Sequence, residues 1–156
     1  MGGAQDNTLY TLELLDKKKY EIFLACNFRG ELVSRAEKID GINLVNIVEL
    51  QREVNFIKDI KALIKIYSLI KKEKFDIVHT HSSKAGVIAR IASKLNKVPL
   101  IIHTVHGFPF NDFMSRIKRS FYIYLEKIMA HFTDALITVS NLNKQKIIDL
   151  KICNGD

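Results

Sequence analysis

The stretch Phe75–Gly86, FDIVHTHSSKAG, decides the fold of this chain. Its first residues are apolar and β-branched, and after a short polar segment they give way to a helical pattern that runs to Leu95. A short apolar run followed by a helical pattern is typical of a buried parallel strand that leads into a helix. In parallel α/β sheets, ligands bind beyond the carboxyl ends of the strands, where helix N-termini offer unpaired N–H groups. We therefore expect a functional edge at this joint. The residues there are Thr80, His81, Ser82, Ser83 and Lys84.

The composition is that of one folded domain. The chain has 156 residues, of which 47% are hydrophobic and 26% charged, and this balance argues against disorder. No apolar run approaches the roughly 18 residues of a membrane span and no leader pattern begins the chain, so we expect a cytoplasmic protein. The two cysteines, Cys26 and Cys153, are far apart and predict free thiols. The net charge of +7 favours phosphate-bearing partners, namely a nucleotide, an anionic lipid surface or nucleic acid, without choosing among them.

Helical and strand-like patterns alternate along the whole chain. Strands are expected at residues 20–26, 44–48, from 75, at 100–106 and at 135–139. Helices are expected at residues 5–17, 31–39, 56–74, 84–95, 112–130 and 141–150. This order predicts an α/β fold with a mostly parallel sheet of about five strands and right-handed crossovers.

Two of the expected helices carry an apolar stripe. In the helix at 56–74 the stripe is Ile57, Ile60, Ile64, Tyr67 and Ile70, and we expect it to face a sheet. In the helix at 112–130, Asp112 is the expected N-cap. The residues expected to face inward from that helix are Phe113, Ile117, Phe121, Tyr124 and Ile128.

The helix at 112–130 is also basic. It carries Arg116, Lys118, Arg119 and Lys127 against one acid, Glu126. A basic amphipathic helix with aromatic residues is typical of contact with anionic lipid at a membrane surface. A plain surface helix packed on the sheet has the same pattern, so both interpretations stay open. The apolar residues expected to be exposed beside these cations are Met114, Tyr122 and Ile123.

Several common motifs are absent from the sequence. It contains no GxGxxG, no GxxxxGK[ST], no GxSxG, no HExxH and no DxD. The dinucleotide fingerprint, the P-loop and the metal-binding aspartate pair of many sugar transferases are therefore missing. His79 and His81 could place two imidazoles on one strand face, but no third ligand is evident and we predict no metal site.

Four segments together resemble the N-terminal half of glycosyltransferase family 4 enzymes. They are Gly2-Gly3-Ala4-Gln5 at a helix start, Asp76–Gly86, His103–Phe110 (HTVHGFPF) and Thr133–Ser140 (TDALITVS). The sequence HSSKAG followed by HTVHGFPF is most similar to that of the family branch that acts in bacterial capsule, exopolysaccharide or O-antigen assembly. The four motifs occur in the family's order and cover nearly the whole chain.

The resemblance implies the N-terminal half of a GT-B fold, a Rossmann-like three-layer αβα sandwich. It implies that residues 1–156 form the acceptor-side domain, and that the donor-binding C-terminal domain is absent from this chain. The activity implied is retaining, metal-independent and cofactor-free transfer from a nucleotide sugar to a lipid-linked glycan, at the inner face of the membrane. Family members begin with a strand before the Gly-Gly turn, and this chain begins at the turn. We therefore expect a fragment that lacks the first strand and does not transfer sugar alone.

The resemblance also implies roles for individual residues. His106 matches the histidine at a strand end that reaches the donor sugar, and Gly2 and Gly3 match the loop that approaches the donor phosphates. A glycine turn at a helix N-terminus suits a diphosphate because its N–H groups need acceptors and no side chain blocks approach. The residues implied at the acceptor side or cleft edge are His81, Ser82, Ser83, Lys84, Gly107 and Phe108.

The other histidines have structural interpretations. Strand alternation places His103 on the face opposite His106, as a core histidine. His79 is expected to be structural, and His131 lies at a helix end, where a cation is favoured. Lys84 can be interpreted equally well as a solvent-exposed residue at a helix start or as a ligand of a phosphate group.

Two alternatives to a transferase domain remain. One is a stand-alone binding subunit that pairs with a separately encoded donor-domain chain. The other is a basic Rossmann-like module that binds nucleic acid, which is disfavoured because no strand face carries clustered aromatic residues.

Overall fold

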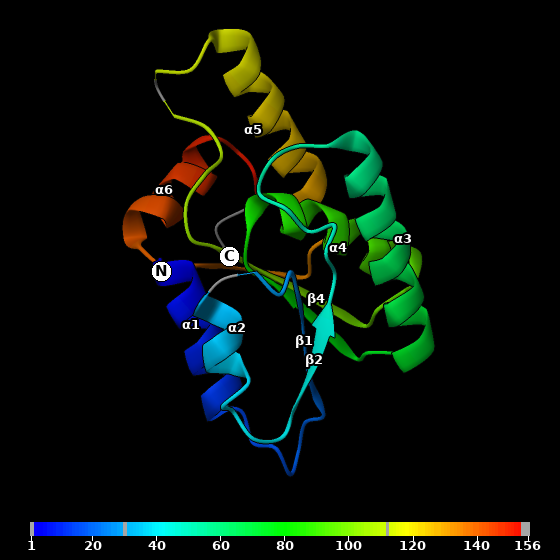
Figure 1. Cartoon of the computed structure of the whole chain (residues 1–156). Helices are drawn as coiled ribbons and strands as arrows, with labels where there is room; N and C mark the ends of the chain where they lie inside the picture. Colours follow the sequence, from blue (N-terminus) through cyan, green and yellow to red (C-terminus); the bar gives the residue numbers. More distant parts are fainter. Residues whose placement is uncertain (1, 30, 112, 154–156) are drawn as a thin grey trace. The chain divides into compact units, whose positions relative to one another are not determined.

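The computed structural model describes residues 2–29, 31–111 and 113–153 (Figure 1). It divides into two compact units, Met1–Lys65 and Ile66–Asp156, and each is described by itself. Within the described residues, the helices are α1 (Gly3–Leu14), α2 (Glu31–Ala36), α3 (Phe56–Glu73), α4 (Ser83–Leu95), α5 (Arg116–Ala130) and α6 (Asn141–Asp149). The strands are β1 (Ile22–Cys26), β2 (Ile42–Asn46), β3 (Ile77–Thr80), β4 (Leu100–Val105) and β5 (Ala135–Thr138).

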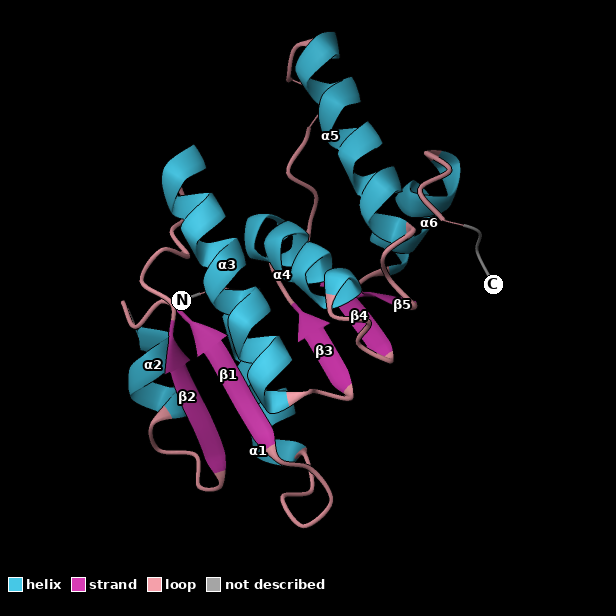
Figure 2. Cartoon of the chain, turned by 90° about the vertical axis from the view of Figure 1, so that its right-hand side faces the viewer, coloured by secondary structure: helices cyan, strands magenta, loops and turns pink. Residues whose placement is uncertain are grey.

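The predicted α/β fold class is confirmed, with helices and strands in the expected order. Every strand pair is parallel, and the ladders form a two-stranded set, β1-β2, and a three-stranded set, β3-β4-β5 (Figure 2). The second strand is displaced from its predicted position, since it covers Ile42–Asn46 rather than residues 44–48. No helix in the described part of the chain is both long enough and apolar enough to cross a membrane.

The first unit packs two helices together beside its pair of strands. Leu9 on α1 and Ala36 on α2 are fully buried. Asp6 on α1 accepts a hydrogen bond from the Arg35 guanidinium on α2, at 2.8 Å, which adds an ion pair between the two helices. Burial of the apolar contact supplies most of the stability here, because a half-exposed ion pair contributes at most about 1 kcal/mol.

The second unit is built on β4, the central strand of its sheet. β4 lies between β3 and β5, and Ile101 in it is almost fully buried. Asp134, in the turn before β5, ties the two strands at their start: its carboxylate accepts from the Ile101 N–H at 2.7 Å and its N–H donates to the Ile101 carbonyl at 2.8 Å. α4 packs on β3 and β4 (Figure 2).

A buried ion pair joins α4 to α5. Arg90 on α4 is 0% exposed, and its Nη2 lies 3.4 Å from Oε2 of the buried Glu126 on α5. Arg90 Nε also donates to the Gly86 carbonyl at 3.1 Å. Such a pair stabilises a particular arrangement more than it adds net stability, because both charges have lost their water.

The start and the faces of α5 differ from the sequence prediction. The helix begins at Arg116 with Ser115 at the N-cap position, whereas the predicted N-cap, Asp112, lies outside the described residues. The stripe expected to face inward is exposed: Phe113, before the helix, is 100% exposed, Ile117 is 87% exposed and Phe121 is 61% exposed. The helix turns Glu126 toward Arg90 instead, and this contact places a different face inside. The remaining exposed members of the stripe are Tyr124 and Ile128, while Met114, Tyr122 and Ile123, expected to be exposed, are half-buried.

A similar rotation affects α3. The predicted inward stripe begins with Ile57, Ile60 and Ile64, and all three side chains are exposed. The prediction holds for the end of the stripe, where Ile70 is buried and Tyr67 is half-buried, and the other buried residues of this helix are Ala62 and Ile66. Isoleucines lie on both faces of α3, so hydrophobic spacing alone does not distinguish the buried face from its neighbour.

Candidate functional site

The carboxyl ends of β3 and β4 bring four histidines together. The two strands are parallel and in register, with Thr80 opposite His103. Because side chains alternate along a strand, His79 and His81 lie on one face of the pair, together with Thr104 and the residue that follows β4, His106. Thr80 and His103 lie on the other face.

The face that carries His103 is packed against α4. His103 is 3% exposed, and its Nδ1 lies 2.7 Å from the Thr80 hydroxyl. A β-carbon added at Gly86 would lie 2.8 Å from the His103 Cε1 atom, closer than packed atoms approach. Gly86 of the HSSKAG motif therefore lets the helix lie directly against the histidine ring. The prediction that His103 is a core histidine on the face opposite His106 is confirmed.

The other face carries a row of imidazoles, which we call the histidine row: His79, His81 and His106. The His79 Nε2 lies 2.8 Å from the Thr104 hydroxyl. The rings of His79 and His81 have centroids 4.1 Å apart, and those of His81 and His106 are stacked at 5.6 Å. The His81 Nδ1 lies 3.3 Å from the His106 Nε2, so the last two rings share a hydrogen bond.

The imidazoles of this region are held in their neutral forms. Burial, with the neighbouring His79 and His106, lowers the pKa of His81 to about 3. Burial, with the nearby Arg90 charge, lowers the pKa of His103 to about 3. Burial also lowers the pKa of His106 and His79. At neutral pH these rings therefore act as hydrogen-bond donors and acceptors rather than as cations.

The segment predicted as the cleft edge follows the histidine row directly. Ser82 is exposed and takes the N-cap position of α4, with an extended backbone. Its carbonyl accepts from the Gly86 N–H at 2.6 Å, and within the described residues its side chain makes no capping hydrogen bond. Ser83 and Lys84 form the first turn of the helix. The structure therefore brings His81, Ser82, Ser83 and Lys84 to the same sheet edge as His106, and their roles toward a ligand stay predictions.

The residues after His106 belong to a second cluster, and their role toward a ligand stays a prediction. Gly107 is exposed, and no described atom lies within 4 Å of a β-carbon placed there. Phe108 packs instead against Val105 and the C-terminal helix, with its ring 4.9 Å from that of Phe110. The Lys146 ammonium lies over the rings of Phe108 and Phe110, at 5.4 and 5.3 Å. The position of Phe108 is thus held by packing.

The predicted phosphate loop belongs to the first unit. Gly2 takes the N-cap position of α1, and its N–H donates to the Gln5 side chain at 3.1 Å. Gly2 and Gly3 are exposed, and no described atom lies within 4 Å of a β-carbon at either position. This turn is open, as close approach of a ligand to the backbone requires, and its role stays a prediction.

The basic residues predicted to face a membrane lie in the first turn of α5. Arg116 and Lys118 are exposed, whereas the Arg119 guanidinium lies 5.9 Å from the centre of the Phe110 ring. Cations at a helix N-terminus are unfavourable, because the helix dipole places partial positive charge there. This end of α5 therefore favours the binding of an anion.

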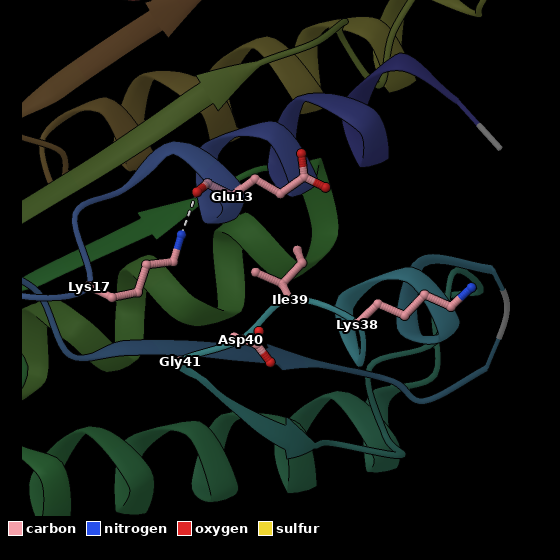
Figure 3. Close-up of a pocket in the computed structure, with 6 residues that line it drawn as sticks. All are labelled: Glu13, Lys17, Lys38, Ile39, Asp40 and Gly41. Atoms are coloured by element: carbon pink, nitrogen blue, oxygen red, sulfur yellow. Dashed lines mark hydrogen bonds between the residues drawn. The ribbon is translucent and has the colours of Figure 1, made fainter.

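Two surface hollows lie away from the histidine row. One of about 510 Å³ is lined by Glu13, Lys17, Lys38, Ile39, Asp40 and Gly41, with the Lys17 ammonium bonded to the Glu13 carbonyl (Figure 3). A second, of about 230 Å³, lies between the ends of α3 and α4, beside Lys74 and Lys97. Both lie near the amino ends of strands, opposite the edge at which parallel sheets bind ligands. Among the described residues, no three His, Cys, Asp or Glu side chains are placed so that together they could hold a metal ion.

Thr104 lies beside the histidine row, and the sequence analysis did not name it as a site residue. It holds His79 through the 2.8 Å contact. Strand periodicity alone could have placed it, since Thr104 precedes His106 by two residues and so shares its face. The contact between His81 and His106 could not be predicted in this way. The two residues are 25 positions apart, and their contact depends on the register of the two strands.

Comparison with known proteins agrees with this architecture. A model of Glycosyltransferase Family 4 matches residues 1–156. The chain is 40% identical, over 93% of its length and 37% of the relative's, to an Escherichia coli protein named UDP-Gal:alpha-D-GlcNAc-diphosphoundecaprenol alpha-1,3-galactosyltransferase. It is 30% identical, over 88% of its length and 34% of the relative's, to the capsular polysaccharide biosynthesis glycosyltransferase CapM of Staphylococcus aureus. It is 25% identical, over 97% of its length and 41% of the relative's, to CapH of the same organism, which carries the same description.

The chain thus spans between about a third and two fifths of the length of these relatives. The family match covers all four motifs and both units of the structure. This chain belongs to Glycosyltransferase Family 4.

Proposed function

We propose that this chain is the acceptor-side part of a glycosyltransferase in bacterial surface polysaccharide synthesis. It would take part in moving a sugar from a nucleotide sugar to a lipid-linked glycan, with retention of configuration and without a metal. The observation that carries the proposal is the hydrogen-bonded His81–His106 pair at the carboxyl edge of β3 and β4, in a family 4 chain. The names of the relatives, which include a galactosyltransferase acting on a diphosphoundecaprenol glycan, support the kind of donor and acceptor.

The chemistry of the edge suits glycosyl transfer. As the bond to the nucleoside diphosphate breaks, positive charge develops on the sugar ring and negative charge on the leaving phosphate. A neutral imidazole at His106 can hydrogen-bond a sugar hydroxyl without repelling the developing positive charge. The backbone N–H groups at the start of α4, beside Ser82, suit an anionic phosphate oxygen. Because the sequence has no DxD pair, we assign this stabilisation to N–H groups and cations.

Binding can be tested on the chain by heteronuclear NMR. The probes are UDP-galactose and a short-chain GlcNAc-diphosphate lipid, which represent the donor and acceptor named for the Escherichia coli relative. We expect at least one probe to shift the signals of residues 81–84 and of His106. The substitution His106→Ala should weaken that response, whereas His131→Ala, at the far end of α5, should not. Shifts confined to other surfaces, or none at millimolar probe, would contradict the proposal.

Transfer itself is expected to require more than this chain. We propose that residues 1–156 alone do not move galactose from UDP-galactose to GlcNAc-diphosphoundecaprenol, because the resemblance assigns most donor contacts to a second domain. A radiolabelled transfer assay measures this directly. Donor-dependent product from the purified chain would refute it.

We also propose that the basic, apolar face of α5 contacts an anionic membrane surface. Ile117 and Phe121 are exposed beside the cations Arg116 and Lys118, so the face offers both apolar area and positive charge. Flotation with phosphatidylglycerol vesicles should carry the chain upward, and phosphatidylcholine vesicles should not. Arg116→Glu with Lys118→Glu should abolish flotation, whereas the matched double reversal Lys144→Glu with Lys151→Glu, in and after α6, should not. Equal flotation of all variants, or none of the native chain, would overturn this localisation.

A further inference from the structure

We infer that His81 is a positioning residue for His106: the hydrogen bond between the two imidazoles holds the ring of His106 in place and fixes which of its nitrogens carries the proton. The inference deepens the proposed function, since it assumes that His106 contacts a ligand. The hydrogen bond and its consequence for the proton can nevertheless be measured without any ligand.

The geometry of the pair requires a single shared proton. His81 Nδ1 and His106 Nε2 lie 3.3 Å apart, and the rings are stacked with an interplanar angle of 29°. Between two neutral imidazoles, one nitrogen must donate and the other must accept. A proton on His81 Nδ1 places the proton of His106 on its Nδ1, and a proton on His106 Nε2 leaves His81 Nδ1 bare. The two tautomers are therefore coupled, and a pair held rigidly by its neighbours keeps one of these two arrangements.

His81 is itself held firmly enough to act as a support. The His79 ring lies against it, with centroids 4.1 Å apart, and His79 is anchored to the Thr104 hydroxyl at 2.8 Å. The preceding residue, Thr80, is locked on the opposite face by His103 at 2.7 Å. The rings on both sides of the sheet therefore restrict rotation of His81.

Burial, together with the groups around His81, keeps the pair neutral. His79 on β3 and His106 after β4 face it, and Arg90 on α4 acts on His103 from the opposite face. Burial and these neighbours lower the pKa of His81 to about 3, so the ring does not become a cation near neutral pH. The pair therefore offers a fixed pattern of one donor and one acceptor. A sugar hydroxyl at the sheet edge would meet a ring of defined polarity, which favours one hydroxyl orientation over another.

The inference can be tested on the isotope-labelled chain by long-range proton–nitrogen NMR of the imidazole rings. Near pH 7, we expect the two nitrogens of His106 to give well-separated signals, one protonated and one bare. The substitution His81→Phe keeps a ring of similar size without nitrogens, and should move both His106 signals toward the average of the two tautomers. The substitution His81→Asn leaves an amide near the position of Nδ1, and should restore most of the separation. His131→Phe is the control, since His131 bonds to the Lys127 carbonyl at the end of α5.

A reciprocal variant keeps the test decisive if His81→Phe does not fold. In His106→Ala, the nitrogen signals of His81 should lose their fixed separation, because its partner is gone. Unchanged His106 tautomers in folded His81→Phe, or unchanged His81 tautomers in His106→Ala, would overturn the inference.

A binding measurement separates this inference from the proposed function. With whichever probe binds the native chain, UDP-galactose or the short-chain GlcNAc-diphosphate lipid, His81→Phe should weaken binding about five- to tenfold, and His81→Asn by less, as loss of one positioned hydrogen bond predicts. If neither probe binds the native chain, the proposed function fails while the tautomer result stands. If the probes bind and the tautomers do not respond to His81, only the positioning role fails.

Discussion

The contact between Gly86 and His103 predicts that Gly86→Ala destabilises the chain. An alanine β-carbon would lie 2.8 Å from His103 Cε1 and 3.1 Å from His103 Nδ1. The ring has nowhere to move, because it is 3% exposed and its Nδ1 is bonded to the Thr80 hydroxyl. Overpacking of this kind costs about 1–3 kcal/mol, and displacing the ring also weakens a hydrogen bond worth about 1 kcal/mol.

The helix propensity of alanine acts in the opposite direction. Replacing glycine by alanine inside a helix stabilises it by about 1 kcal/mol. We therefore expect a net loss of about 1–3 kcal/mol in the free energy of unfolding, measured by urea denaturation. For a chain of this size the midpoint of thermal unfolding should fall by roughly 2–10 °C.

Two further variants show whether the clash is the cause. Gly3→Ala is the matched control, since no described atom lies within 4 Å of its β-carbon, and it should be neutral or slightly stabilising. In a His103→Ala background the ring is absent, so adding Gly86→Ala should no longer destabilise. A Gly86→Ala variant that is more stable than the native chain would falsify this account of why the motif carries glycine.

Three other measurements follow from buried or strained groups. Glu126→Ala leaves the Arg90 charge buried without its partner, and should lower the free energy of unfolding by about 3 kcal/mol; Arg90→Met with Glu126→Leu should recover most of it in urea titrations. His81 and His103 have a pKa of about 3 in the folded chain, below the roughly 6.5 of an unfolded one, so the unfolded state binds more protons between these values. The free energy of unfolding should therefore fall as the pH drops through this window, by at most about 1.4 kcal/mol per pH unit for each imidazole, and a pH-independent value would contradict their burial as neutral rings. Lys97 has a φ of 57°, and Lys97→Gly should raise the melting temperature by relieving about 0.5–1 kcal/mol of left-handed strain.

Local patterns in the sequence were sufficient for the order of the elements and for the faces of single strands. Apolar runs and helical spacing predicted a parallel α/β chain, and strand alternation placed His103 and His106 on opposite faces. Ser140 caps the last helix in a similarly local way, since its hydroxyl accepts from the Asn143 N–H at 3.2 Å. These features depend on residues a few positions apart, so short stretches of sequence are enough to predict them.

Features that depend on distant neighbours were beyond such reasoning. The exposed stripe of α5, which includes Ile117, was predicted to be buried, because spacing shows that a helix has an apolar face and says nothing of what covers it. The ion pair from Glu126 to Arg90, which turns another face inward, joins residues 36 positions apart. The hydrogen bond from His81 to His106 likewise arises only when two parallel strands are brought into register. Folding chooses among the faces and pairings that the local patterns permit, because burial and strand register are properties of the assembled chain.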